Sequence, residues 1–244
     1  MIKPEDFVTL IPDKLDFEHA APLFCPGVTA YKAVKAAEPT LGKSVGIFGA
    51  GGVGHLAIQF AKLHGSRVIA ISRSKNHLDI AKRLGADNVF AYGSYDHTAV
   101  HNDDIKNSRE NASSHNIKEE SIRIQQESFI ANLKKEDEGK LLDSAIVFAP
   151  SEEVIATAIK SVKKGGIIIV GVAGNIPYFS FAEEKIIKGS VIGPIKDMMD
   201  VIRIASYYDI EVVVDTFPLE KANEVLSKLK VSEIKSRAVL LPHQ

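Results

Sequence analysis

The chain has 244 residues, and its 30 lysine and arginine residues nearly balance its 31 aspartate and glutamate residues. The formal charge of −1 at pH 7 lacks the basic excess of a nucleic-acid-binding surface, so we expect no nucleic-acid partner. No apolar run approaches the ~20 residues of a membrane span and the N-terminus has no signal-peptide pattern, so we expect no membrane partner. The single cysteine, Cys25, excludes an intrachain disulfide and favours a cytoplasmic location.

The first 30 residues do not resemble the start of an independent domain. Residues Phe7 to Ile11 predict a strand, and Asp16 is a candidate N-cap for a helix over residues 17–23. The segment that begins at Cys25 breaks this helix and starts another, which runs to about Ala37. A chain of this length has room for one large α/β domain, or for one domain with a fragment of another.

A glycine-rich turn follows, between a short apolar strand and an amphipathic helix. Gly49, Gly51 and Gly54 form the pattern G-x-G-x-x-G in the strand–turn–helix context of a dinucleotide-binding turn. Gly49 permits the tight turn, Gly51 lets a pyrophosphate approach the backbone, and Gly54 lets the helix pack close to the strand. With Gly52 and Val53, this turn predicts a dinucleotide site; the alternative is an ordinary turn between a strand and a helix.

Strands and helices alternate after this turn, which is typical of a parallel sheet with crossover helices. The predicted strands of this sheet cover residues 45–48, 67–72, 87–91, 144–149, 165–171 and 190–193. The helices between and after them are predicted over residues 55–62, 75–84, 152–162 and 196–208. The sequence therefore predicts an α/β fold, a doubly wound Rossmann sheet of strand order 3-2-1-4-5-6. Beyond it we expect strands over 211–217 and 236–241, with a helix over 219–229 between them.

A long polar segment from about residue 93 to 142 interrupts this alternation. We expect it to be either a disordered insertion or an insertion with its own helix, for which the apolar spacing indicates residues 117–135. The segment contains several potential metal ligands: His97, His101, Asp103, Asp104 and His115. Their spacing matches no ligand template, so a solvated surface insertion is favoured over a metal site.

The end of the second predicted strand indicates which nicotinamide cofactor is preferred. A site for NAD places an acidic residue there, about 20 residues past the glycines, to bind the ribose 2′-hydroxyl. This chain has Ser72, Arg73 and then Lys75, and no acid. A hydroxyl and a guanidinium would bind a 2′-phosphate that a carboxylate would repel, so we predict NADP(H) over NAD(H). The alternative is that Arg73 and Lys75 are solvated residues at the start of a helix.

Several motifs occur in a characteristic order: residues 20–31, 49–54, 83–87, 165–172, 218–224 and 236–240. Over nearly all of its length except the polar segment, the chain resembles the cofactor-binding half of the zinc-dependent medium-chain alcohol dehydrogenases. The run Ile-Ser-Arg-Ser around Arg73 is similar to that of their NADP-dependent cinnamyl-alcohol-dehydrogenase-like branch. The resemblance implies hydride exchange between a nicotinamide and a primary alcohol or aldehyde that zinc polarises.

The resemblance also implies roles for single residues. Cys25 falls on the third ligand of the catalytic zinc, and Thr29 falls on a catalytic position beside the nicotinamide ring. Val170 and Val172 belong to the strand end that lines this ring, and Arg237 matches an arginine that neutralises the pyrophosphate. The alternative for a solitary cysteine after a helix is a small buried apolar residue.

The family's other zinc ligands, its proton relay and its structural-zinc lobe have no counterpart among these 244 residues. The resemblance therefore implies a truncated chain, in which residues 1–30 and 197–244 are remnants of a GroES-like catalytic domain around a Rossmann domain of residues 31–196. One thiolate cannot hold a catalytic zinc, so zinc is doubtful in this chain and we expect impaired turnover.

Three functions stay open at this point: part of an aldehyde reductase, a catalytically silent NADP(H)-binding or scaffold module, or one chain of a split enzyme. In the last case the partner is a separate zinc-lobe chain. A homodimer that pairs residues 190–193 edge to edge is expected by analogy with the family, and exposed strand edges predict a chain that needs a partner.

Overall fold

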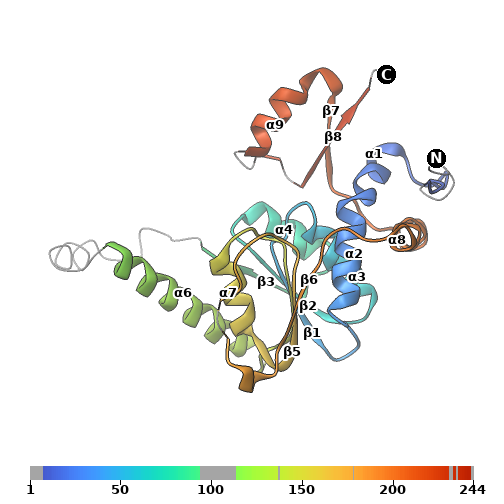
Figure 1. The fold of residues 1–244 in the computed structure, drawn as a ribbon. Helices are drawn as coiled ribbons and strands as arrows, with labels where there is room; N and C mark the ends of the chain where they lie inside the picture. Colours follow the sequence, from blue (N-terminus) through green and yellow to red (C-terminus); the bar gives the residue numbers. More distant parts are fainter. Residues whose placement is uncertain are drawn as a thin grey trace, which may run out of the picture.

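The computed structural model describes residues 8–93, 114–136, 138–177, 179–230, 233–234 and 236–242. Its larger sheet contains β1 (Ser44–Phe48), β2 (Arg67–Ser72), β3 (Asn88–Ala91), β4 (Leu142–Val147), β5 (Val162–Val170) and β6 (Ile186–Gly189). All five strand pairs are parallel, and the order is β3-β2-β1-β4-β5-β6. The predicted doubly wound α/β sheet is thereby confirmed (Figure 1).

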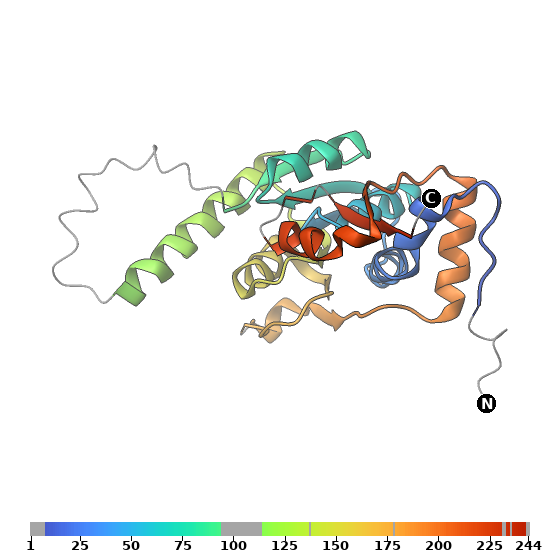
Figure 2. The ribbon, with the colours of Figure 1, turned by 90° about the horizontal axis from the view of Figure 1, so that it is seen from above.

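Helices cover both faces of this sheet, which explains why every residue of the central strand β1 is buried. The helices on one face are α2 (Pro26–Ala36), α3 (Gly54–Leu63), α4 (Lys75–Arg83) and α8 (Ile195–Tyr207), and their apolar residues share one core with the sheet. The opposite face is covered by α6 (Ser114–Glu136) and α7 (Glu152–Ser161), which contribute to a second core. Viewed from above, α6 and α8 lie at opposite ends of the molecule (Figure 2).

A smaller lobe stands at the end of the chain, above the carboxyl ends of the central strands in Figure 1. It contains β7 (Val214–Pro218), the short η4 (Leu219–Lys221), α9 (Ala222–Lys230) and β8 (Arg237–Leu241). β7 and β8 pair in parallel as a separate two-stranded sheet. The strand predicted over residues 211–217 is present as β7, which starts three residues later. The helix predicted over residues 219–229 begins as the 3₁₀ turn η4.

The N-terminal helix is confirmed in two pieces, α1 (Phe17–Ala20) and the 3₁₀ turn η2 (Ala21–Phe24). Asp16 caps α1 as predicted, because its carboxylate accepts the His19 N–H at 2.8 Å. Pro22 follows within the second piece and is buried. A further 3₁₀ turn, η3 (Phe181–Glu183), precedes β6.

Two predicted strands are wrong. Residues 8–11 have no regular structure, and Leu10 is 91% exposed, because no described strand lies beside them to supply a hydrogen-bonded ladder. The sixth strand is not Ser190–Gly193 but Ile186–Gly189, which pairs with the end of β5. Both segments are short and apolar, and only pairing with β5 distinguishes them.

The helix that was predicted inside the polar segment is present as α6. Its second half is not a solvated surface element, because Phe129 and Leu133 are 6% and 1% exposed in the second core. Phe129 makes edge-to-face contacts with the rings of Phe48, Phe90 and Tyr92. The histidines and aspartates that were weighed as metal ligands lie outside the residues whose side chains are described.

Candidate functional site

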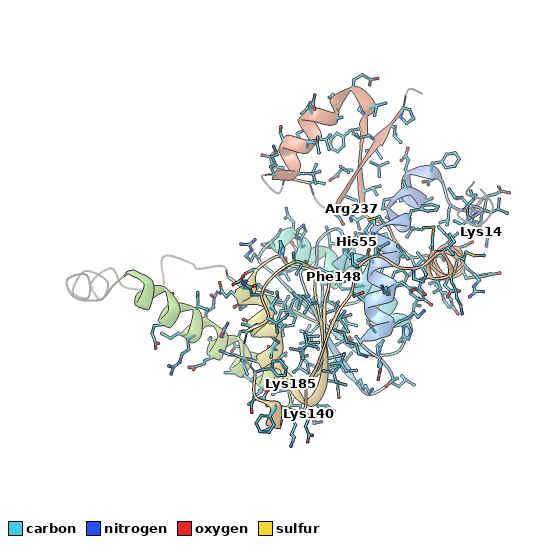
Figure 3. All side chains as sticks on the ribbon, in the orientation of Figure 1. Lys14, His55, Lys140, Phe148, Lys185 and Arg237 are labelled. Carbon is cyan, nitrogen blue, oxygen red and sulfur yellow. The ribbon has the colours of Figure 1, made fainter. Side chains whose placement is uncertain are left out.

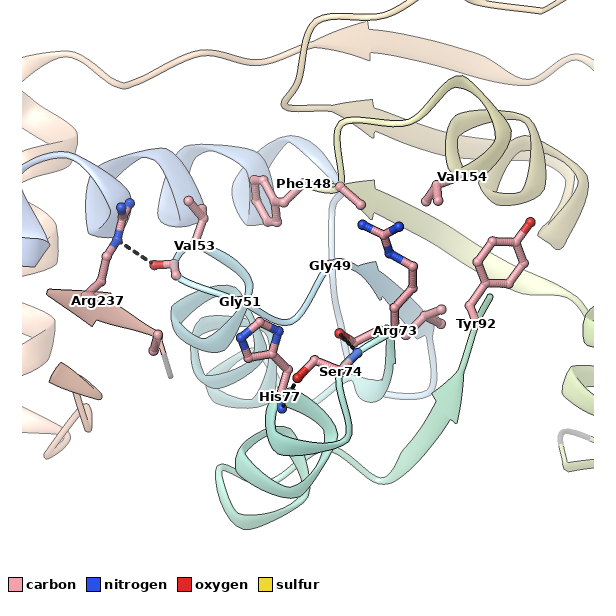
Figure 4. Close-up of a pocket in the computed structure, with 15 residues that line it drawn as sticks. Gly49, Gly51, Val53, Arg73, Ser74, His77, Tyr92, Phe148, Val154 and Arg237 are labelled. Atoms are coloured by element: carbon pink, nitrogen blue, oxygen red, sulfur yellow. Dashed lines mark hydrogen bonds between the residues drawn. The ribbon is translucent and has the colours of Figure 1, made fainter. Parts of the chain in front are cut away.

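A cavity of about 580 Å³ lies at the carboxyl ends of β1, β2 and β4, where the strand order reverses. This crevice is the place where open α/β sheets bind their ligands. It is lined by Gly49, Gly51, Gly52, Val53, Ile71, Ser72, Arg73, Ser74, His77, Tyr92, Phe148, Ala149, Val154, Ser236 and Arg237 (Figure 4). Residues from the sheet, from the glycine turn and from the C-terminal lobe thus meet around one space.

The glycine turn has the geometry that a close backbone approach requires. Gly49 has φ +105°, and a Cβ there would lie 2.9 Å from the backbone nitrogen of Ala149. A Cβ on Gly54, the first residue of α3, would lie 1.9 Å from the carbonyl oxygen of Gly49. A Cβ on Gly51 would meet only the imidazole of His77, at 3.4 Å, so Gly51 faces the cavity.

Arg237, the first residue of β8, closes one side of the cavity. Its Nε donates to the carbonyl oxygen of Gly52 at 3.1 Å (Figure 4). A Cβ on Gly52 would lie 2.8 Å from the Ser236 carbonyl oxygen and 2.9 Å from this Nε, so only glycine fits under the arginine. Burial lowers the pKa of the Arg237 guanidinium, while the neighbouring Cys25 acts in the opposite direction. The guanidinium keeps its charge at neutral pH, since arginine is not deprotonated in proteins.

His55, the second residue of α3, connects the glycine turn to the C-terminal lobe by hydrogen bonds. Its side chain is fully buried, and Nε2 accepts the Val213 N–H at 3.3 Å. The proton is therefore on Nδ1, which lies 3.1 Å from the Gly51 carbonyl oxygen and 2.9 Å from the Ser236 hydroxyl. Burial lowers the pKa of His55 from 6.5 to about 4, so the imidazole is neutral at pH 7.

Arg73 lies at the carboxyl end of β2, on the other side of the glycine turn. In Figure 4 its guanidinium points into the cavity, toward Val154 and the ring of Tyr92. Its side chain passes over Gly93, where a Cβ would lie 3.3 Å from the arginine Cδ. Arg73 forms no ion pair with any residue that the structure describes. Nearby, the Ser72 hydroxyl accepts the Ser74 N–H at 3.3 Å.

The model of the "Zinc-binding dehydrogenase" family matches residues 52–206, which is more than half of the chain. The chain belongs to this family. It is 33% identical over 240 residues to an alcohol dehydrogenase of Geobacillus stearothermophilus, an alignment that covers 96% of this chain and 61% of the relative.

Solved structures support the assignment of this chain to the zinc-binding dehydrogenase family. An alcohol dehydrogenase of the archaeon Aeropyrum pernix has a TM-score of 0.75 and 26% identity, over 96% of this chain and 61% of that chain. A cinnamyl alcohol dehydrogenase of Sorghum bicolor has a TM-score of 0.70 and 25% identity, over 97% and 58%. The present chain therefore spans about 60% of the length of these relatives.

Of the residues that the sequence predicted to bind the cofactor, seven lie in the lining of this cavity. They are Gly49, Gly51, Gly52, Val53, Ser72, Arg73 and Arg237. Gly54 lies directly behind the turn, buried at the start of α3. Lys75 is exposed at the start of α4 and is outside the lining, as are Val170 and Val172. Val170 is buried at the end of β5, and Val172 packs against the second core.

Thr29 and Cys25 also lie outside the cavity lining. The Thr29 hydroxyl donates to the Cys25 carbonyl oxygen at 2.7 Å, one turn back along α2. Cys25 is exposed rather than a buried apolar residue, which overturns the alternative reading of this cysteine. No group of three or more histidine, cysteine and acidic side chains that could hold a metal occurs in the described part of the chain. A catalytic zinc needs three protein ligands, so the described residues do not fit one.

Several cavity residues were missed by the sequence analysis: Ile71, Ser74, His77, Tyr92, Phe148, Ala149, Val154 and Ser236. Phe148 and Ala149 follow β4, and their place beside the strand-order reversal was a signal that could have identified them. His77 and Tyr92 had no such signal, because they reach the cavity only through the packing of α4 and β3.

None of the described helices is long and apolar enough to cross a membrane.

Proposed function

We propose that this chain is the NADP(H)-binding part of an alcohol dehydrogenase or aldehyde reductase, and that NADP(H) binds in preference to NAD(H). The observation that carries the preference is Arg73, a guanidinium without an ion-pair partner among the described residues, at the carboxyl end of β2 inside the cavity. None of the described residues that line this cavity is acidic, so none of them would repel a 2′-phosphate.

The remaining parts of the cofactor have matching partners in the same cavity. The positive end of the α3 dipole and the charge of Arg237 suit a pyrophosphate beside Gly51 and Gly52. Tyr92 and Val154 offer apolar surface to an adenine base next to Arg73. When bound, the nicotinamide supplies the hydride exchange with a primary alcohol or aldehyde. The residues named here bind and orient the nucleotide, with Val170, Val172 and Thr29 proposed at the nicotinamide end.

Fluorescence titration of the purified chain with NADPH and NADH tests the preference. The parent chain is expected to bind NADPH more tightly, and Arg73→Ala is expected to weaken NADPH about tenfold while NADH changes little. Lys75→Ala is the matched control, since Lys75 lies two residues after Arg73, at the start of α4, and is outside the cavity lining. Equal affinities in the parent chain, or an equal effect of both substitutions, would contradict the preference.

Arg237→Gln provides a second prediction with a different signature. The pyrophosphate is common to both cofactors, so this change is expected to weaken NADPH and NADH alike, by about tenfold. Arg203→Gln, which removes an exposed arginine that pairs with Asp200 on α8, is expected to change neither affinity. A selective loss of NADPH in Arg237→Gln would mean that this arginine binds the 2′-phosphate instead.

The domain division and the assembly remain part of this proposal. We assign residues 31–196 to the cofactor domain and the two flanking segments to remnants of a catalytic domain. A separate zinc-lobe chain, or a homodimer, would supply a partner. For the homodimer we now propose β6, because it is an outer strand of the sheet and its Ile186 is 45% exposed. Sedimentation of the purified chain distinguishes a monomer from a dimer.

A catalytically silent NADP(H)-binding module is the second candidate function, and it is favoured by Cys25 being the single zinc ligand with a counterpart in this chain. The measurement that separates the two is the zinc content of the purified chain together with NADPH-dependent reduction of cinnamaldehyde. Turnover with bound zinc would support the enzyme, and tight NADPH binding without turnover would support the module.

A further inference from the structure

A second hollow, of about 630 Å³, lies at the other end of the larger sheet, where the parallel strands begin. Figure 3 shows Lys140, which lines it, at the opposite end of the sheet from His55 and Arg237. Among the described residues, its cationic lining residues are Lys43, Arg67, Lys134, Lys140, Lys163 and Lys164, and its one acidic lining residue is Asp143. The hollow is thus separate from the cofactor cavity, and its described lining carries many more positive charges.

Positive charge is concentrated here far beyond its share in the chain. Six of the twelve described lining residues are lysine or arginine, whereas the whole chain has 30 such residues among 244 and a formal charge of −1. The cations come from the segments before β1 and β4, the starts of β2 and β5, and the end of α6. Like charges that gather in one concave space repel each other unless an anion joins them.

The one carboxylate among the described lining residues already has partners. Asp143 accepts the Ser44 N–H at 2.8 Å and lies 2.5 Å from Lys163 Nζ. Burial raises the pKa of Asp143, but the hydrogen bonds from Lys163 and Ser44 outweigh it and leave the pKa below its ordinary value. The carboxylate is therefore charged at neutral pH and neutralises one lysine, Lys163, so it does not balance Lys43 or Lys134.

Two of the remaining cations have partners of their own. Arg67 donates to Asn88 Oδ1 at 2.9 Å and to the Glu136 carbonyl oxygen at 2.8 Å. Lys164 lies 3.8 Å from the Glu184 carboxylate.

The other lysines of the hollow have weak partners or none among the described residues. Lys43 bonds to the Glu38 carbonyl oxygen at 3.3 Å, and Lys134 has no ion pair among the described residues. Lys140 pairs with Glu138 at 3.3 Å with both side chains at least 70% exposed. Exposed pairs of this kind contribute little, and each ammonium has three donors, so most of their hydrogen-bonding capacity is open to a ligand.

Helix dipoles give a simpler explanation for part of this cluster. Helices α6 and α7 end at this side of the sheet, and lysines near a helix C-terminus are stabilised by its partial negative charge. That effect is confined to the last turn and is screened by solvent. It accounts for Lys134 alone, and not for cations that converge from four other segments of the chain.

We propose that this hollow binds a compact anion that carries several negative charges, such as a polyphosphate or a tricarboxylate. Its volume falls in the range of small-molecule sites, roughly 300–1,000 Å³. Lys43 and Lys134 are the side chains that the anion engages most strongly, because neither has a carboxylate partner among the described residues. The site is independent of the nucleotide cavity and does not rest on the proposed cofactor preference.

Isothermal titration calorimetry of the full chain with tripolyphosphate, and separately with citrate, tests this site. Tripolyphosphate is expected to bind in a saturable 1:1 manner at low salt and to weaken as salt is raised. Lys43→Gln with Lys134→Gln is expected to weaken it about tenfold or more. Lys221→Gln with Lys230→Gln, two exposed lysines of the C-terminal lobe, is the matched control and is expected to retain the parent affinity.

Thermal melting of both double variants tests whether each is folded. NADPH titration tests whether the hollow is independent of the nucleotide cavity. The double variant in the hollow is expected to keep the parent's NADPH affinity, and Arg73→Ala is expected to keep the parent's tripolyphosphate affinity. Binding that does not saturate, or that both double variants weaken equally, would reduce the hollow to non-specific surface charge and overturn the proposal. Preference for citrate over tripolyphosphate would assign the site to carboxylates, and the reverse preference to phosphates.

Discussion

Gly54→Ala is expected to destabilise the chain by about 3 kcal/mol or more and to abolish nucleotide binding. The added Cβ would lie 1.9 Å from the carbonyl oxygen of Gly49 and 2.9 Å from its carbonyl carbon. Both are backbone atoms of the turn that connects β1 to α3, so no side chain can move to relieve the clash. The helix must shift away from the strand, which removes the turn from its position under the cavity.

Two other glycines make this result interpretable. Gly189→Ala, on the edge strand β6, is expected to be nearly neutral because nothing lies within 4 Å of its Cβ. Gly51→Ala is expected to leave the melting temperature nearly unchanged but to weaken both cofactors, because its Cβ contacts only His77 and points into the cavity. Melting curves and nucleotide titrations of the three variants provide the measurement. A Gly54→Ala chain that melts like its parent would refute the close packing of α3 on the turn.

His55 is expected to make the stability of the chain fall as the pH drops from about 6.5 to about 4. In the unfolded chain a histidine gains a proton near pH 6.5, whereas burial holds the pKa of folded His55 at about 4. Between these values the unfolded state binds one more proton, so the unfolding free energy decreases with falling pH, by roughly 3 kcal/mol in total. The cost has a geometric cause, since a proton on Nε2 would face the Val213 N–H, donor against donor.

Urea unfolding of the parent and of His55→Gln, at pH 7 and pH 4.5, measures this contribution. The glutamine carbonyl can still accept the Val213 N–H but does not titrate, so the variant is expected to be less stable at pH 7 and to lose less stability on acidification. His64→Gln, which removes an exposed histidine just past the same helix, is expected to show the parent's pH dependence. An unchanged pH dependence in His55→Gln would mean that other groups cause the acid sensitivity. Because His55 also ties Gly51 to the C-terminal lobe, His55→Gln is expected to weaken nucleotide binding modestly at pH 7.

Local signals were sufficient for most of the fold. The strands β1, β2 and β4 are almost entirely buried runs flanked by turn residues, and their length is visible without any partner. Asp16 and Gly85 mark a helix start and a helix end through short-range hydrogen bonding and a φ of +100°. The errors fell where pairing decides: residues 8–11 have strand-forming composition without a strand beside them, and β6 is chosen over residues 190–193 by its register with β5.

By itself, the sequence determined most of the sheet strands, the glycine turn and the residues at the end of β2, because these depend on local patterns. The strand order followed from the alternation of strands and helices, although β1 and β4 pair across about 100 residues. The family resemblance named Arg237 for the pyrophosphate, but tertiary structure alone decided the contacts that close the cavity. The Arg237–Gly52 and His55–Val213 hydrogen bonds join residues more than 150 positions apart, and no periodicity records such a pairing. The cationic hollow has the same origin, since its lysines are unremarkable one by one along the chain. They form a site only because parallel strands bring their amino ends to one edge of the sheet.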